Sequence, residues 1–244
     1  MMAVKGMGVQ LLPYEIEGEI GLDVVITNRD ATAADLIQAL QLPADEPSIV
    51  KPYHKQRYGV CRGCVNNCCK YNSIVVDLVA AQRLATNLGL SLSRFAQSYL
   101  SYHPDLPFPE FKRRPCPFLV DNCCTVYSSR ALICRLYLCT PMTERLEKLR
   151  SAVLLAGEAA LRQRLVELGI GPGSWHERQL REALNRRYRG GDLSHEGWVE
   201  RKEQLDLLLH GNPFLEGRDY DNTLLRECCV PELWLQICNN VSAV

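Results

Sequence analysis

The chain has 244 residues, of which 47% are hydrophobic and 23% are charged, and its 28 basic side chains balance its 28 acidic ones. This length allows a sizeable core, and the composition is that of an ordinary globular protein. A formal net charge of zero supplies no global attraction to nucleic acid or to an anionic membrane, so neither is favoured as a partner. No apolar run approaches the roughly 18 residues that a membrane-spanning helix needs.

Whether the cysteines indicate metal sites or disulfides depends on the redox compartment in which the protein works. Residues 1–10 carry one lysine and no long apolar stretch, which is unlike a secretory signal peptide. We therefore expect a cytoplasmic, reducing environment, in which the 12 cysteines indicate metal or redox chemistry. Structural disulfides are the alternative, and the sequence alone leaves it open.

Residues 1–52 predict an N-terminal lead-in element followed by a linker. Residues 24–27 are typical of a strand, and Asp30 is placed to cap a helix over about residues 31–42. Three prolines then interrupt regular structure and indicate the linker, namely Pro43, Pro47 and Pro52.

Residues 53–140 predict a metal-binding domain, because they hold nine closely spaced cysteines. These are Cys61, Cys64, Cys68, Cys69, Cys116, Cys123, Cys124, Cys134 and Cys139. Short spacing lets one turn of backbone direct several sulfurs toward one point, which suits soft metals. Neighbouring side chains tend to diverge, so the adjacent pair Cys68–Cys69 favours two metal ions or a polynuclear cluster over one tetrahedral ion.

Between the two cysteine groups the pattern predicts a short strand over residues 73–76 and a helix capped by Asp77. A second helix is expected from Ser91 or Ser93 to about Tyr102. The proline-rich stretch 104–117 predicts an irregular loop.

Residues 141–244 predict a helical C-terminal region packed on the metal-binding domain. One long amphipathic helix is expected from about residue 146 to the glycines at 169 and 171, with further helices over roughly 175–189, 194–210 and 220–240. The predicted fold class is mainly α, with a small, irregular cysteine-rich metal-binding segment and little strand.

The region from about Val60 to Cys139 resembles the CxxCxxCC family of zinc- or iron-chelating domains, also known as YkgJ-like. After the first cysteine group and the Asp77 helix, the family motifs recur in order. They are Cys116-Pro-Phe-Leu119, Cys124-Thr-Val-Tyr127, Arg130 and Cys134-Arg135. Two departures are one extra residue before the paired cysteines and Ala131 where the family usually has proline.

Spacing and resemblance together imply a ligand set of Cys61, Cys64, Cys68, Cys69, Cys116, Cys124 and Cys134. This many thiolates exceeds one zinc site, so an iron–sulfur cluster is the first expectation and zinc is the alternative. Arg130 and Arg135 are expected to donate hydrogen bonds to such a cofactor or to offset its charge, with surface ion pairing as the alternative. For Cys123, Cys139, Cys228, Cys229 and Cys238 both ligation and simple burial stay open.

The sequence thus predicts a metal-binding cysteine-cluster protein of unassigned pathway. The resemblance also implies a remote relation to flagellin lysine N-methylases, and hence a cluster-dependent protein methyltransferase as one alternative. The sequence contains no motif for a catalytic site or for the cofactor of a methyltransferase, so catalytic residues stay unassigned. A zinc-stapled module that binds an unidentified protein partner is the other alternative.

Overall fold

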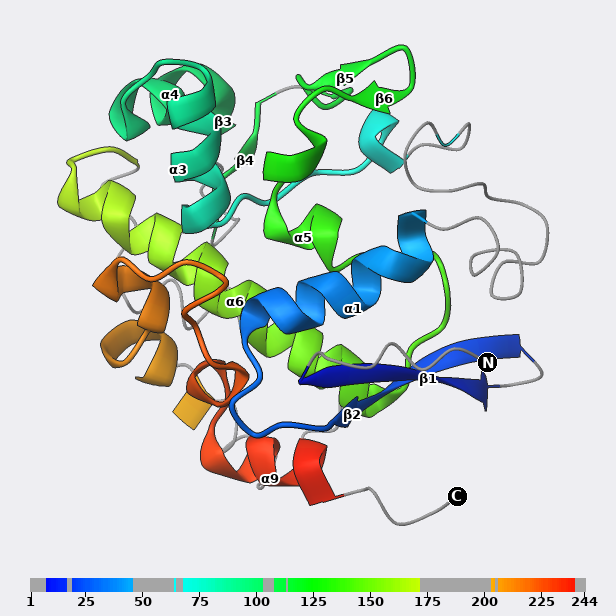
Figure 1. Ribbon diagram of the computed structural model, residues 1–244. Coiled ribbons are helices and arrows are strands. Elements are labelled where there is room, and N and C mark those ends of the chain that lie inside the picture. The colour runs from blue at the N-terminus through cyan, green and yellow to red at the C-terminus, as the bar shows by residue number, and fades with distance from the viewer. Residues whose placement is uncertain are drawn as a thin grey trace.

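A central helix, α6 (Glu144–Glu167), crosses the molecule, with the other elements packed around it (Figure 1). The computed structural model describes residues 8–16, 19–45, 64, 68–102, 108–112, 114–171, 203–204 and 206–239. The Thr143 hydroxyl caps α6 by accepting a hydrogen bond from the amide of Leu146. Every residue from 152 to 162 is buried, so the amphipathic pattern expected here is wrong for the middle of the helix. The reason is that neighbours cover this segment on all sides.

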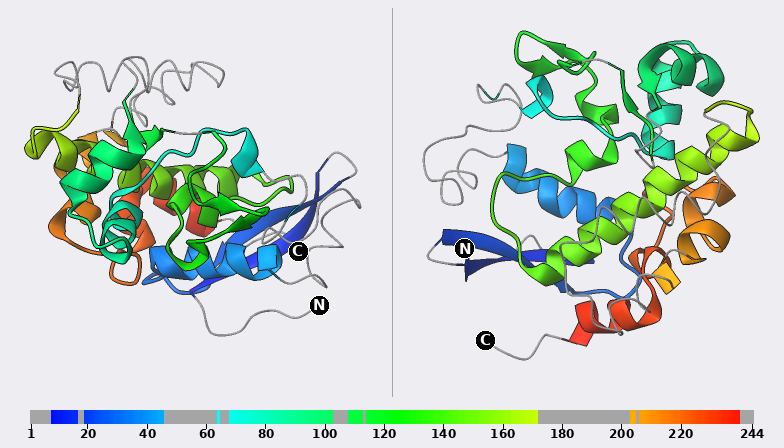
Figure 2. Two further views of the ribbon diagram at one scale, coloured as in Figure 1. Left: turned by 90° about the horizontal axis from the view of Figure 1, so that it is seen from above. Right: turned by 180° about the vertical axis from the view of Figure 1, so that it is seen from behind.

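A hairpin of β1 (Val9–Ile16) and β2 (Glu19–Ile26) lies at the N-terminal end of α6 (Figure 2). Its strands are antiparallel, with Val9 opposite Ile26. The sequence predicts only the second strand. The amide of Leu22 donates to the carbonyl of Pro141 at 2.9 Å, and the amide of Thr143 donates back to the carbonyl of Leu22 at 2.9 Å. These bonds fix the hairpin against the start of α6.

Helix α1 (Ala33–Asp45) confirms the predicted N-terminal helix, but its cap differs from the expectation. Thr32, rather than Asp30, caps it, because the Asp35 amide donates to the Thr32 hydroxyl while the Asp35 carboxylate accepts from the Thr32 amide at 2.8 Å. Asp30 instead forms an ion pair with Arg226. The helix also continues through Pro43, which therefore does not mark its end.

The cysteine-rich half contains short elements around two helices. Helix α3 (Leu78–Asn87) begins at Asp77 as predicted, and α4 (Leu92–Tyr99) begins at Ser91 but ends earlier than expected. The expected strand over residues 73–76 is reduced to one bridge between Val75 and Glu110. The remaining elements are η1 (Cys68–Lys70), β3 (Leu100–Ser101), β4 (Glu110–Phe111), β5 (Leu119–Val120), β6 (Cys123–Cys124), η2 (Tyr127–Ser129) and α5 (Leu132–Arg135).

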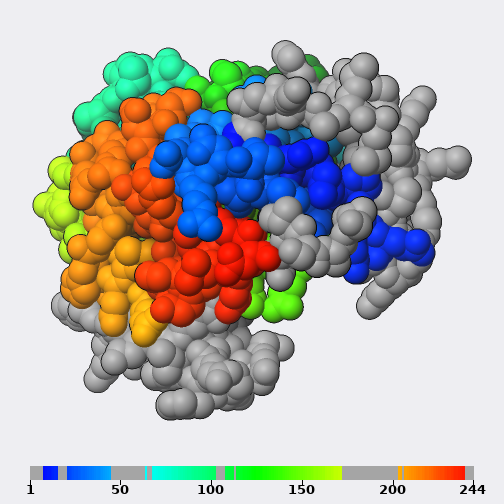
Figure 3. All heavy atoms as spheres, turned by 60° about the horizontal axis from the view of Figure 1, so that its bottom comes forward, coloured from blue at the N-terminus to red at the C-terminus, as the bar shows by residue number. Residues whose placement is uncertain are grey.

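The C-terminal segment returns to lie beside α1 (Figure 3). It contains η3 (Pro213–Glu216), η4 (Leu225–Cys228) and α9 (Pro231–Asn239). The Ala33 amide donates to the Thr223 carbonyl at 2.8 Å, and the Leu225 amide donates to the Ala31 carbonyl at 2.9 Å. One continuous helix over 220–240 is therefore wrong. Proline is favoured in the first turn of a helix, and α9 begins at Pro231.

Mainly helical structure with short two-stranded sheets confirms the predicted fold class. The helix expected over 175–189 lies outside the described residues, and only the last part of the one over 194–210 lies within them. None of the described helices combines the length and apolar composition needed to cross a membrane.

A buried carboxylate, Asp77, connects three parts of the chain. Its oxygens accept hydrogen bonds from the Ala80 amide at 3.0 Å, the Leu132 amide at 2.7 Å and the Tyr220 hydroxyl at 2.6 Å. Gly157 of α6 lies against the same point, where an added Cβ would be 2.9 Å from the Cβ of Asp77. One side chain thus joins α3, α5 and the C-terminal segment beside α6.

Replacing Asp77 by alanine should lower the free energy of unfolding by about 3–5 kcal/mol, because it leaves three buried donors without their charged acceptor. Urea denaturation followed by circular dichroism measures this. Ser91→Ala is the matched control, since Ser91 only caps α4 at the surface, and it should cost about 1 kcal/mol. Equal losses in the two variants would show that Asp77 acts as a helix cap alone.

Candidate metal centre

Five cysteine thiols line one cavity of about 150 Å³ in the cysteine-rich half of the molecule. They come from four segments of the chain and are Cys68, Cys69, Cys116, Cys124 and Cys134. Phe111, Phe118 and Ile133 supply apolar parts of the wall, and Arg130 is the one cation among the lining residues. The cavity thus combines soft sulfur donors with apolar surroundings.

Backbone hydrogen bonds bring the first two segments together. Cys68 and Cys69 lie in η1, a single turn of 3-10 helix. The amide of Cys116 donates to the carbonyl of Cys69 at 2.8 Å, and the amide of Leu119 donates to the carbonyl of Cys116 at 3.0 Å. The proline-rich loop is therefore fixed directly against the first cysteine group.

The β5–β6 hairpin positions Cys124. Its two-residue turn is Asp121-Asn122, and both residues have positive φ angles, 48° and 61°. Aspartate and asparagine tolerate this left-handed backbone, which is typical of tight hairpin turns. Successive side chains of a strand point to opposite faces, so Cys124 faces the cavity while Cys123 is exposed.

Helix α5 positions Cys134. Asp77 accepts a hydrogen bond from the Leu132 amide at the start of this one-turn helix. The amide of Cys134 then donates to the Ala131 carbonyl at 2.9 Å. The predicted cap Asp77 therefore also fixes a cavity thiol, a role that the sequence pattern does not indicate.

The thiols interact electrically with each other and with Arg130. A hydrogen bond between the Cys68 and Cys69 side chains lowers the pKa of Cys68 and raises that of Cys69. Burial raises the pKa of Cys124 and Cys134, and the positive charge of Arg130 offsets part of this rise at both. A cation at this point favours thiolates, the form in which cysteine binds metals.

Arg130 is buried, and its position is defined by a ring rather than by an acid. Its guanidinium carbon lies 3.8 Å from the centroid of the Tyr127 ring. Its Nε has no hydrogen-bond partner among the described residues. A buried guanidinium with an unpaired donor beside several thiols fits a site that accumulates negative charge.

The other residues of the predicted set lie elsewhere. Cys61 is outside the described residues, and Cys64 is half-buried but does not line the cavity. Arg135 lines a second cavity. Cys139 is exposed, and Cys228 and Cys229 are buried in the core.

The thiols line the cavity without yet meeting at one point. Within the ranges that the structure describes, no three cysteine, histidine, aspartate or glutamate side chains already form a group able to hold a metal ion. Sequence reasoning missed Tyr137, which also lines the cavity. It lies beyond the end of α5 at Arg135, so no helical spacing connects it with Cys134 in the sequence.

Burial predicts how fast individual cysteines react in the metal-free, reduced protein. N-ethylmaleimide should label exposed Cys123 at least about 100-fold faster than Cys228, because reaction requires an accessible thiolate. Burial excludes Cys228 from solvent and raises the pKa of its thiol. Peptide mapping by mass spectrometry over a time course measures both rates, and equal rates would contradict the packing of the C-terminal segment.

Comparison with known proteins supports the chemistry that the cavity indicates. No curated protein and no solved structure matches the chain. One family model does match: residues 60–152 correspond to CxxCxxCC, described as a "Putative zinc- or iron-chelating domain". This segment contains all five cavity cysteines, together with Cys61 and Cys64.

Proposed function

We propose that this protein binds a metal centre of more than one metal atom through its cysteine-rich half, and that this centre is an iron–sulfur cluster. The observation that carries the proposal is the set of five thiols from four segments that line one cavity. The ligands would be drawn from these five and from Cys61 and Cys64, which precede Cys68 in the same family segment.

The donor set supports a soft metal. Thiolates bind zinc and iron–sulfur clusters in preference to hard cations such as magnesium and calcium. No carboxylate is among the described residues that line the cavity, and Asp77, which lies outside it, accepts three hydrogen bonds. Arg130 supplies the positive charge that several thiolates at one place require.

The number of thiols favours a polynuclear centre. A closed zinc site has four ligands, and one zinc ion would leave at least one of the five cavity thiols unused. The adjacent pair Cys68–Cys69 adds to this argument, because both members line the cavity. An iron–sulfur cluster would supply electron-transfer chemistry, and the apolar wall around it would influence its reduction potential.

The sparse regular structure of this half gives the metal a structural role as well. The strands β3, β4, β5 and β6 have two residues each, and α5 is a single turn. Such elements have few hydrogen bonds of their own. Because the ligands span residues 68–134, metal binding would hold these segments together.

Metal and sulfide analysis of protein purified without oxygen tests the proposal. We expect iron with a matching amount of acid-labile sulfide, and broad visible absorption that disappears on reduction or chelation. Bound zinc without visible absorption would mean that the centre is a structural zinc site and not an iron–sulfur cluster. Protein that contains neither metal would contradict the metal-binding function itself.

Two neighbouring substitutions sharpen this test. Cys124→Ser removes a thiol that lines the cavity, whereas Cys123→Ser removes an exposed thiol one residue away. We expect Cys124→Ser to lose most of the bound metal and Cys123→Ser to retain it. Because the two variants share chemistry and location, equal metal content in both would exclude Cys124 as a ligand.

A further inference from the structure

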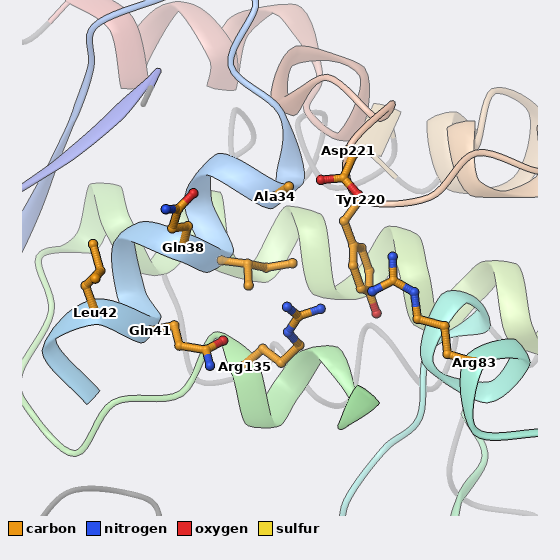
Figure 4. Close-up of a pocket in the computed structure, with 9 residues that line it drawn as sticks. Ala34, Gln38, Gln41, Leu42, Arg83, Arg135, Tyr220 and Asp221 are labelled. Carbon is orange, nitrogen blue, oxygen red and sulfur yellow. The ribbon is translucent and has the colours of Figure 1, made fainter. Parts of the chain in front are cut away.

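A second cavity, of about 320 Å³, is lined by Arg135 of α5 but by none of the described cysteines (Figure 4). It is formed between α1, α3, α5 and the loop that carries Tyr220 and Asp221. This volume is at the lower end of the range found for small-molecule sites. The CxxCxxCC segment contributes Arg83 and Arg135, whereas α1 and the Tyr220 loop lie outside that segment.

Two arginines meet in this cavity across one aromatic ring. The guanidinium carbon of Arg83 is 5.0 Å from the centroid of Tyr220, and that of Arg135 is 5.3 Å from the same centroid. Figure 4 shows the guanidinium groups of Arg83 and Arg135 on either side of the Tyr220 ring. Two positive charges therefore lie beside one ring, and this arrangement favours an anion that both guanidinium groups can reach.

Acids lie near both arginines, and the Asp77 carboxylate acts electrostatically on Arg135. Arg83 forms an ion pair with Asp219 at 3.0 Å. For Arg135 no carboxylate lies within ion-pair distance in the part of the chain that the structure describes, and its Nε lacks a hydrogen-bond partner there. Asp221 is exposed at the rim. The vacant donor capacity is therefore concentrated at Arg135, in the inner part of the cavity.

The ring that both arginines contact is rigidly held. Tyr220 is buried, and its hydroxyl donates to Asp77 at 2.6 Å. Asp77 in turn accepts the Leu132 amide at the start of α5, the helix that ends at Arg135. Both guanidinium groups are thus positioned before a ligand arrives, which reduces the ordering that binding requires.

The rest of the lining indicates what the anion is attached to. Ile37 and Leu42 of α1 present apolar surface, and Gln38 and Gln41 of the same helix present amide groups. We propose that this cavity binds a small organic anion, whose carboxylate or phosphate group is bound by Arg83 and Arg135 and whose remainder packs on α1. Arginine suits both groups because its planar fork of donors matches their oxygens.

Isothermal titration calorimetry on the full chain tests this proposal, with inorganic phosphate and butyrate as probes. Chloride is exchanged for each probe at constant ionic strength, so that general screening does not change. We expect saturable binding of at least one probe, weakened at least about tenfold by Arg83→Gln or Arg135→Gln. Arg94→Gln is the control, because Arg94 is exposed on α4 and away from the cavity.

The calorimetric outcomes distinguish the two ligand classes and test the site itself. Saturation by phosphate alone assigns a phosphate-bearing ligand, and saturation by butyrate alone assigns a carboxylate with an apolar part. Absence of saturation by both probes, or an Arg83→Gln affinity equal to that of Arg94→Gln, would overturn the site. Arg83 lies on α3, apart from the cysteines, so Arg83→Gln remains informative if Arg135→Gln misfolds. Binding that persists in Cys124→Ser would separate this site from the metal proposal.

Discussion

The buried carboxylate of Asp77 is the interaction on which both cavities depend. It caps α3, fixes the first amide of α5 and accepts the hydroxyl of Tyr220. A buried charge is stable only where hydrogen bonds replace water, and here three donors do so, two of them from distant parts of the chain. The close approach of Gly157 explains how α6 fits beside this group, because a larger residue would meet the Cβ of Asp77 at 2.9 Å or less.

Helix α5 contributes to two sites with different chemistry. Cys134 lines the thiol cavity, and the next residue, Arg135, lines the cavity of the two arginines. On a helix, consecutive side chains point about 100° apart, so neighbouring residues of one turn can line two different cavities. The same short element therefore presents a thiol to one cavity and a guanidinium group to the other, with Asp77 fixing its start.

The sequence predicted well those features that depend on local pattern. The helix cap Asp77, the start of α4 at Ser91 (one of two candidates) and the mainly helical class follow from residue type and spacing. Features that depend on distant contacts were missed. Tyr220 is 143 residues from Asp77, and no local signal pairs them. Likewise α6 reads as amphipathic, but its middle is buried on all sides because separate elements cover each face.

The three adjacent cysteine pairs show why local pattern cannot assign ligands. Cys123–Cys124 lies on a strand, where neighbours point to opposite faces, so only Cys124 reaches the cavity. Cys68–Cys69 lies in a 3-10 turn, where neighbours point about 120° apart, so both can line one concave wall. Cys228–Cys229 is buried among the apolar residues of the core. The same dipeptide thus gives one, two or no cavity thiols according to backbone conformation and surroundings, and these follow from the fold rather than from spacing.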